Sequence, residues 1–401
     1  MNEDDSQKIA GIYTSRGWQL TKDRKDADLV IINSCTVRQH AEDRAVSELG
    51  RLRKWKDAKS GRKIIFAGCA AERLGETLKK RFPFLDDFVG ARNQDKFEKL
   101  AGEEQDVYTQ AKLFNSPVTD YLTIMRGCSM KCAYCIVPAV RGPAVSIPLI
   151  NILREAERKA SEGIKEIILL GQTVNCWKDP HSGENFPALL KKLCLIKGLE
   201  RIKFMSPHPI FFDEDFFITF AQNPKLARHI HLPAQSGSER ILKLMKRGYS
   251  ASSYLKIVQK LRKAVPEVSL STDFIVGFPG ETEEDFQKTL ELARKALFSF
   301  AFCFKYSPRT DRPQDISDVD EKEAAKRLAR LLEVIKKGSK EIFQERIGKT
   351  EEVLLEKEGF GKTSTGFNCA IIDSKKTSHG SAVKVKIERA AGSILYGKVL
   401  K

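Results

Sequence analysis

Short apolar segments alternate with helical patterns through the middle of this 401-residue chain. The segments are rich in Ile, Leu, Val and Phe, which is typical of buried strands. The expected strands are Leu122–Met125, Glu166–Leu170, Arg201–Met205, His229–Leu232, Leu270–Val276 and Phe300–Tyr306. Helical segments such as Ile150–Gly163 and Thr282–Ala296 lie between them. Six strand–helix units in succession predict an α/β fold with a partial parallel (β/α)6 barrel.

Three cysteines follow the first of these strands at C-x3-C-x2-C spacing: Cys128, Cys132 and Cys135. Three thiolates at this spacing can wrap as a loop around one metal centre. They would fill three irons of a [4Fe–4S] cube and leave the fourth iron open to a second molecule. Zinc is the main alternative, but it normally needs a fourth Cys or His nearby, and none lies within the following 40 residues. We therefore expect a catalytic iron–sulfur cluster at the rim of the barrel.

Polar and glycine-rich loops follow the other predicted strands at the same rim. Such loops can hold a bulky polar cofactor through backbone and hydroxyl hydrogen bonds, although each alone also fits ordinary turn chemistry. The candidate cofactor-binding residues are Tyr134, Gly171, Gln172, Gln235, Ser236, Ser271 and Asp273. Tyr134, between the last two cysteines, fits a role in core packing equally well. We expect no catalytic side chain beyond the cluster ligands.

Residues 1–114 predict a small α/β domain of their own. Two buried-strand patterns, Ala27–Asn33 and Lys63–Ala67, run up to Cys35 and Cys69, and a helical pattern follows each cysteine. Both cysteines should therefore lie at the carboxyl ends of parallel strands, the edge where such sheets bind ligands. A shared cluster is one interpretation and a buried free cysteine is the other. Two ligands are too few for a well-held cube.

The pattern changes again near the C-terminus. A charged amphipathic helix over Asp320–Arg346 connects the barrel to short alternating strands punctuated by glycine. The expected strands are Glu352–Glu356, Cys369–Ile372, Ala382–Arg389 and Ser393–Leu400. They predict a small antiparallel β-barrel over residues 343–401, after a barrel domain with its connector helix over 115–342. Its many lysines favour an RNA-binding module, with a basic structural cap as the alternative.

Composition narrows the class of protein. The net charge of +16 suits a polyanionic partner such as RNA or DNA. Nine cysteines, an odd number, in a chain without a signal peptide argue against a disulfide framework and for thiolate ligands. No apolar run approaches the roughly 18 residues of a membrane span. We expect a cytoplasmic protein with no membrane partner.

The motifs resemble those of the radical S-adenosylmethionine (SAM) methylthiotransferases, of the MiaB type. These enzymes make 2-methylthio-N6-isopentenyladenosine next to the anticodon of tRNA. The resemblance covers the whole chain, in the order methylthiotransferase domain, radical SAM barrel, TRAM domain. The motifs that carry it are Asn33–Arg38, Gly68–Ala70, Arg126–Pro138, Arg141-Gly142, Gly171–Asn175, His231–Ser238 and Ser271–Glu281.

The resemblance implies a set of cofactors and partners. SAM would bind the open iron at Cys128, Cys132 and Cys135, and its cleavage would give a 5′-deoxyadenosyl radical that abstracts hydrogen from C2 of the modified adenosine at position 37. A second, auxiliary [4Fe–4S] cluster on Cys35 and Cys69 would supply sulfur, and a second SAM the methyl group. The implied partners are a tRNA anticodon stem-loop and a one-electron reductant such as a flavodoxin. We expect a monomer.

One departure from the family concerns the auxiliary cluster. Members carry a third cysteine in a Gly-Cys-Gln-Met-Asn motif, whereas this chain begins at Met1-Asn2, followed by Asp5-Ser6, which looks like the remainder of that motif. We expect either a truncated or misassigned start or an incomplete cluster, for which Asp4 is a candidate substitute ligand.

Three other functions compete with this interpretation. Two relatives methylthiolate threonylcarbamoyladenosine in tRNA or an aspartate of a ribosomal protein. A degenerate homologue that binds RNA without inserting sulfur is a third alternative. The amino-acid sequences of the motifs Cys35–Arg38 and His231–Ser238 favour the isopentenyladenosine type.

Overall fold

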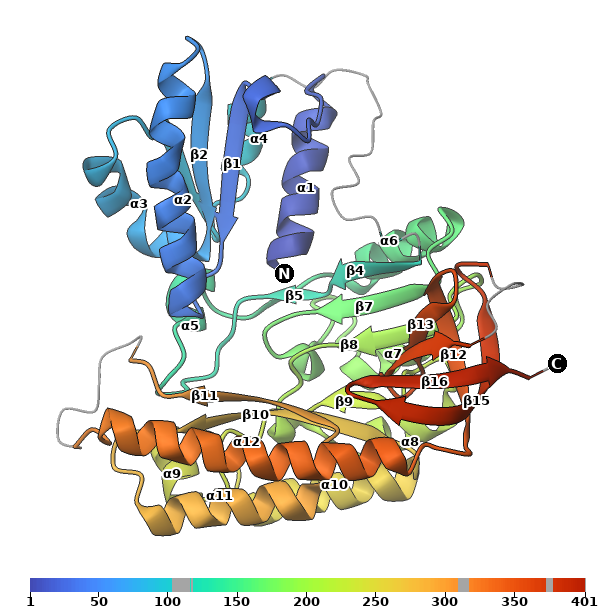
Figure 1. The fold of residues 1–401 in the computed structure, drawn as a ribbon. Helices are drawn as coiled ribbons and strands as arrows, with labels where there is room; N and C mark the ends of the chain where they lie inside the picture. The colour runs from blue at the N-terminus through green and yellow to red at the C-terminus, as the bar shows by residue number, and fades with distance from the viewer. Residues whose placement is uncertain (103–115, 117, 309–316, 373–377, 401) are drawn as a thin grey trace. The chain divides into compact units, whose positions relative to one another are not determined.

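The computed structural model describes residues 1–102, 116, 118–308, 317–372 and 378–400 (Figure 1). It divides into two compact units. The first comprises Met1–Asn115, Arg126–Met130 and Cys135–Val145, and the second comprises Ser116–Met125, Lys131–Tyr134 and Ser146–Lys401. The predicted boundary between residues 114 and 115 lies outside the described residues. The division into three domains stays a prediction.

A three-stranded parallel sheet, in the order β1-β2-β3, organises the first unit. Its strands are β1 (Leu29–Ser34), β2 (Lys63–Gly68) and β3 (Asp87–Gly90). The helices are α1 (Asn2–Thr14), α2 (Gln39–Asp57), α3 (Cys69–Arg81), α4 (Lys96–Ala101) and α5 (Val137–Arg141), with a 3-10 turn η1 (Arg24–Asp26). The two strands expected before Cys35 and Cys69 are β1 and β2, so that prediction is confirmed. Helix α1 was not predicted.

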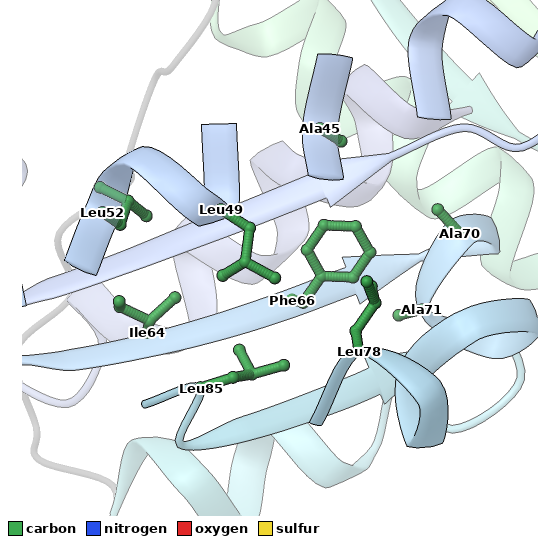
Figure 2. Close-up of a cluster of buried hydrophobic side chains, with 9 residues drawn as sticks. All are labelled: Ala45, Leu49, Leu52, Ile64, Phe66, Ala70, Ala71, Leu78 and Leu85. Carbon is green, nitrogen blue, oxygen red and sulfur yellow. The ribbon is translucent and has the colours of Figure 1, made fainter. Parts of the chain in front are cut away.

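Alternate residues of β2 give this sheet two buried faces. The first cluster of buried side chains consists of Ala45, Leu49, Leu52, Ile64, Phe66, Ala70, Ala71, Leu78 and Leu85, from the sheet, α2 and α3 (Figure 2). The second consists of Ile9, Tyr13, Ile65, Ala67, Val89, Phe97 and Ala101, from the sheet, α1 and α4. Ile64 and Phe66 thus face one layer of helices, and Ile65 and Ala67 face the other. Packing on both faces fixes the carboxyl ends of β1 and β2.

Six parallel strands, in sequence order, form the partial barrel of the second unit. They are β4 (Thr119–Thr123), β7 (Glu166–Leu170), β8 (Arg201–Phe204), β9 (His229–His231), β10 (Ser269–Val276) and β11 (Phe300–Lys305). The first three pair as β4-β7-β8 and the last three as β9-β10-β11. Each predicted strand of the barrel is present, which confirms the α/β class and the six-unit barrel. The two-residue strands β5 (Met125–Arg126) and β6 (Val145–Ser146) form a sheet of their own.

Helices connect and cover these strands. They are α6 (Leu149–Ser161), α7 (Phe186–Cys194), α8 (Glu214–Gln222), α9 (Glu239–Leu244), α10 (Ala251–Ala264), α11 (Glu283–Ala296) and α12 (Glu321–Gln344), with 3-10 turns η2 (Val174–Cys176) and η3 (Pro209–Phe211). The long helix α12 packs on β10 and β11 (Figure 1). It contains most of the expected connector helix.

A closed five-stranded barrel ends the chain, with the strand order β12-β13-β14-β16-β15. Its strands are β12 (Thr350–Lys357), β13 (Phe360–Thr363), β14 (Asn368–Ile371), β15 (Ala382–Ala391) and β16 (Ile394–Val399). The predicted barrel is confirmed, but one of its pairs, β14 with β16, is parallel. Strand β13 was not predicted from the sequence, because Gly361 is typical of a turn. A Cβ there would lie 2.1 Å from the Leu354 carbonyl oxygen, so the glycine permits the close approach of β12.

Candidate active site

Cys35 and Cys69 lie at the same edge of the first unit's sheet. Ser34 and Gly68 are register partners at the ends of β1 and β2, and the two cysteines come directly after them. Gly68 has φ +88°, and a Cβ there would lie 2.2 Å from Asn33 Oδ1, so only glycine makes this turn. The two thiols are close enough to interact electrostatically. The structure thus brings this predicted pair together, and its role as cluster ligands stays a prediction.

An arginine donates directly to one of these sulfurs. Arg141, at the end of α5, donates from Nε to Cys69 Sγ over 3.1 Å. Burial raises the pKa of the Cys69 thiol, and the guanidinium opposes this by favouring the thiolate. The Arg141 side chain is itself only 6% exposed, so its charge needs a partner.

Asp5 provides that partner. Its carboxylate, 1% exposed, accepts from Arg141 Nη2 at 2.9 Å through Oδ2 and from Arg126 Nη1 at 2.7 Å through Oδ1. Burial alone would raise the pKa of Asp5, but the two arginines outweigh it and the pKa is lowered. Asn2 Oδ1 also accepts from Arg141 Nη2, at 3.0 Å. Helix α1 therefore fixes the arginine that contacts Cys69.

The proposed substitute ligand, Asp4, has a different partner. Its carboxylate pairs with Lys8 one helical turn further along α1, at 2.9 Å. Its neighbour Asp5 is the acidic residue that acts on the Cys69 thiol electrostatically. In the described ranges, no group of three or more His, Cys, Asp or Glu side chains is arranged to hold a metal ion.

The cysteine loop contributes to both units. Cys128 and Cys135 belong to the first unit and Cys132 to the second. The backbone N–H of Cys128, which is buried, donates to the Gly142 carbonyl at 3.0 Å, and this bond closes the loop's base. Three thiols at this spacing are the soft donor set that a [4Fe–4S] cluster requires.

The sulfur of Cys132 also accepts a hydrogen bond from an arginine. Arg247 donates from Nη1 to Cys132 Sγ over 3.2 Å and from Nε to the Tyr249 hydroxyl at 3.2 Å. The Tyr249 hydroxyl in turn lies 2.9 Å from the Ala234 carbonyl oxygen. Burial would lower the pKa of Arg247, but Tyr134, Tyr249 and Cys132 more than offset it. Arg247, 5% exposed, is therefore a buried cation beside a predicted iron ligand.

Tyr134 packs in the core of the second unit. It lies against a buried cluster of Ile241, Met245 and Phe278. The neighbouring Ala133 N–H donates to the Met245 carbonyl at 3.1 Å, which anchors this part of the loop. The core-packing interpretation therefore describes its contacts, and its assignment to cofactor binding stays a prediction.

In the loops after β7 and β8, two buried polar atoms have no hydrogen-bond partner among the described residues. One is Oε1 of Gln172, beside Gly171 at the end of β7, and the other is Nε2 of His208, after β8. Desolvation, helped by the charge of Arg247, lowers the pKa of His208 to about 3, so the imidazole is neutral. Asn175 joins the two loops, because its side chain bonds both the N–H and the carbonyl of His208, at 2.8 and 3.0 Å. Unsatisfied buried atoms of this kind fit a site that takes a polar ligand.

Polar side chains of β9 and β10 form a second cluster within the strands, where Ser271 and Asp273 are the third and fifth residues of β10 rather than its carboxyl end. Ser271 Oγ bonds His231 Nδ1 at 2.9 Å and His229 Nε2 at 3.0 Å, and His231 Nε2 lies 3.2 Å from Asp273 Oδ2. Ser271 is buried, whereas the Asp273 side chain is 25% exposed. Of the two predicted residues, Asp273 is the better placed to reach a ligand.

In the loop after β9, the two predicted cofactor-binding residues, Gln235 and Ser236, make hydrogen bonds within the protein. Gln235 has φ +68°, and its N–H donates to the Asp273 carbonyl at 2.8 Å. The Ser236 hydroxyl, 1% exposed, bonds Thr289 Oγ1 at 3.2 Å and accepts from the Ser238 N–H. These contacts fix the loop, and a cofactor contact from either residue stays a prediction.

Comparison with known proteins places this geometry in a family. The model of the radical SAM superfamily matches residues 122–293, and that described as uncharacterized protein family UPF0004 matches residues 1–90. The chain is 40% identical over 409 residues to the tRNA-2-methylthio-N(6)-dimethylallyladenosine synthase of Endomicrobium trichonymphae, covering 100% of this chain and 97% of that protein. The synthase of the same name from Sulfurimonas denitrificans is 40% identical over 421 residues, covering 100% and 96%. This chain belongs to the radical SAM methylthiotransferases of the MiaB type.

The fold of this methylthiotransferase is shared with a solved radical SAM enzyme. The radical SAM methyltransferase TsrM from Kitasatospora setae, solved with tryptophan and a SAM analogue, matches with a TM-score of 0.53 at 14% identity. The match covers 74% of this chain and 64% of that one, and it concerns the fold alone. Membership of the radical SAM superfamily implies SAM and a [4Fe–4S] cluster as cofactors. No helix among the described residues of the methylthiotransferase could cross a membrane.

Three residues of this site were not among the sequence predictions: Asp5, Arg141 and Arg247. Asp5 and Arg141 occurred in motifs of the resemblance but without a role. Its contact with Cys69 bridges 72 positions, and that of Arg247 with Cys132 bridges 115. No local pattern marks such contacts. The nearest available signal is the position of Arg141, six residues after Cys135.

Proposed function

We propose that this methylthiotransferase adds a methylthio group to C2 of N6-isopentenyladenosine at position 37 of tRNA, next to the anticodon. The observation that carries the proposal is the 40% identity to synthases named for this product, over the whole chain. Identity of this extent spans the cysteine loop and the strand ends together. It favours the isopentenyladenosine substrate over threonylcarbamoyladenosine or a ribosomal protein.

Cys128, Cys132 and Cys135 would hold the SAM-binding [4Fe–4S] cluster. When bound, the cluster and SAM supply one-electron cleavage of the cofactor, the radical chemistry that an unactivated aromatic C–H needs. Arg247 donates to Cys132 Sγ, so it would fix the rotamer of one ligand and offset its negative charge. Gln172 and Asp273 would bind polar groups of SAM, because the first has an unpartnered buried oxygen and the second is partly exposed on β10.

Cys35 and Cys69 would hold an auxiliary [4Fe–4S] cluster, the second of two. This pair supplies two of the three thiolates that the family resemblance implies. Arg141 would stabilise Cys69 as a thiolate, the form that binds iron. Iron and sulfide analysis of anaerobically reconstituted protein tests this assignment. About eight irons per chain are expected, and about four in Cys69→Ala; about four in the wild type would contradict the second cluster.

The tRNA partner would be bound through its anticodon stem-loop. Lys386 of β15 and Lys398 of β16 are register partners, and both are exposed, as is Lys384. Together with the net charge of +16, these lysines suit a phosphate backbone. Because tRNA is the substrate, we place the reaction in the cytoplasm. We also propose a monomeric enzyme that receives its electrons from a one-electron reductant such as a flavodoxin.

Nucleoside analysis tests the substrate. The tRNA of a strain that lacks this gene should contain N6-isopentenyladenosine without the 2-methylthio mark, and the wild-type gene should restore the mark. A gene carrying Cys132→Ala should not restore it. If the mark persists in a deletion strain that has no second such enzyme, the assignment is wrong. If threonylcarbamoyladenosine loses its methylthio group instead, the neighbouring specificity applies.

A further inference from the structure

Strand β11 carries three phenylalanines at alternate positions: Phe300, Phe302 and Phe304. Alternate residues of a strand point to the same face, so the three rings form one row. The rings of Phe300 and Phe302 meet edge to face with centroids 4.6 Å apart, and those of Phe302 and Phe304 stack at 6.3 Å. We call these three residues the aromatic row.

The aromatic row shares its face with the polar cluster of β9 and β10. In the parallel register, Phe300 pairs with Ser271 and Phe302 pairs with Asp273, so these side chains point the same way. The ring of Phe302 also meets that of His231, with centroids 6.1 Å apart. An apolar surface therefore continues directly into the residues predicted to bind the cofactor.

Among the described residues, two rings of the row are exposed on this face. On the opposite face of β10, the side chains of Leu270, Phe274 and Val276 are each 1% exposed or less, and α12 packs on β10 and β11. Figure 1 shows α12 running along these two strands. By contrast, Phe300 is 49% and Phe302 is 40% exposed. Exposed phenylalanines next to each other are costly in water, so they indicate a surface that a ligand covers.

We propose that the aromatic row binds the substrate nucleoside, with its adenine ring and its N6-dimethylallyl group lying against Phe300 and Phe302. This inference rests on the proposed function and names the residues that would select its substrate. The occupant follows from three observations. The row adjoins the predicted cofactor residues, the relatives are named for a dimethylallyladenosine, and the net charge of +16 suits the RNA that carries it.

The chemistry of the occupant matches the row. An adenine ring has a flat π-face, and a base stacked on an aromatic side chain gains affinity whatever its edge carries. The dimethylallyl group adds five carbons without a polar atom. Removing those carbons from water against phenylalanine favours the modified adenosine over the unmodified one. The row would therefore set specificity for the N6 group as well as the position of the base.

Equilibrium binding of two RNAs tests the inference. Both probes are the same labelled anticodon stem-loop, one with N6-isopentenyladenosine at position 37 and one with adenosine, titrated with anaerobically reconstituted protein by fluorescence anisotropy. We expect the wild type to prefer the isopentenyl RNA about tenfold or more. Phe302→Ala should bring the preference to within about twofold of unity, and Phe302→Trp should keep most of it.

Matched variants make the result decisive. Phe300→Ala, at the most exposed position of the row, is the second test and should also lower the preference; thermal unfolding by circular dichroism checks that each variant is folded. Ile218→Ala removes an apolar side chain of similar exposure, 51%, on α8 and should leave the preference unchanged. A preference retained in both phenylalanine variants would overturn this inference alone. A wild type without any preference would overturn the proposed substrate and the inference with it.

Discussion

Arg141 donates from Nε to the Sγ atom of Cys69 across 3.1 Å. A second arginine, Arg247, has the same relationship with Cys132 at 3.2 Å. Each unit thus holds one buried guanidinium against one cysteine predicted to bind iron. Hydrogen bonds to ligand sulfurs set the reduction potential of iron–sulfur clusters and orient their ligands. The two arginines would therefore act as positioning residues if the two predicted clusters bind at these cysteines.

Replacing Arg247 should weaken the SAM-binding cluster. Arg247→Met keeps the length of the side chain but removes the donor and the charge beside Cys132. We expect iron to be lost about ten- to hundredfold more readily to a chelator, the usual size of an outer-ligand effect. Absorbance of the reconstituted cluster during chelator titration measures this loss. Arg240→Met is the matched control, because Arg240 bonds the Gly280 carbonyl and Asp285 rather than a sulfur. Equal chelator sensitivity in both variants would contradict the role of Arg247.

Asp5→Asn should strongly destabilise the first unit. The substitution leaves Arg126 with a weaker partner and Arg141 buried without its compensating charge. Breaking a buried ion pair from one side costs about 3–5 kcal/mol of unfolding free energy. Urea unfolding followed by circular dichroism measures the change.

The adjacent residue provides the control for that substitution. Asp4→Asn removes a carboxylate of the same helix whose partner, Lys8, is 47% exposed. The Asp4 side chain is also buried, at 7% exposed, but Lys8 stays partly solvated when that charge is lost, so we expect a smaller loss than from Asp5→Asn. Similar losses of unfolding free energy in the two variants would contradict the proposed importance of the Asp5 ion pairs for the stability of the first unit.

Cys132→Ala should abolish SAM cleavage, because the cluster would lose one of its three thiolates. Detection of 5′-deoxyadenosine after reduction with dithionite measures cleavage directly. Cys194→Ala is the control: burial raises the pKa of the Cys194 thiol to about 11, and it ends helix α7. That variant should cleave SAM normally. Cleavage by Cys132→Ala at the wild-type rate would remove Cys132 from the ligand set.

The parts of the fold that the sequence predicts are those with local signals. The strands of the barrel are short apolar runs between polar turns, and so are β1 and β2 before Cys35 and Cys69. A strand of this kind can be predicted from its own residues, without knowing which elements it packs against. The same holds for the cysteine loop, whose spacing is itself the signal. Carboxyl ends of parallel strands meet at one edge, so the position of Cys35 beside Cys69 also follows.

The missed features depend on residues far apart in the chain. Helix α1 has mostly polar residues, and the burial of Asp5 within it makes sense only with Arg141, 136 positions away. The sequence predicts the strand that carries the aromatic row. It does not predict that Phe300 and Phe302 are exposed, because this depends on which face of the strand α12 covers. Polar Asp4 and Asp5 look equivalent in the sequence. Both are buried, and their partners distinguish them: Asp4 pairs with the partly exposed Lys8, whereas Asp5 pairs with Arg126 and Arg141.

A last prediction concerns acid stability. The pKa of His208 is lowered by burial to about 3 in the folded protein, against an ordinary value of 6.5. The folded state therefore binds this proton more weakly than the unfolded state. Its contribution to stability is complete above pH 6.5 and is lost progressively as the pH falls toward 3. Between pH 7.5 and 5.5 this single group should cost about 1.4 kcal/mol of unfolding free energy.

His208→Asn isolates that contribution. The His208 Nδ1 atom accepts from the Ile210 N–H at 3.3 Å, and an asparagine side chain caps a helical turn in the same way without titrating. Urea unfolding of both proteins at a series of pH values should show the wild type losing stability faster below pH 6.5. The difference between the two curves removes every other titrating group. Parallel curves from pH 7.5 to 5.5 would mean that His208 is protonated equally easily in the folded and unfolded states.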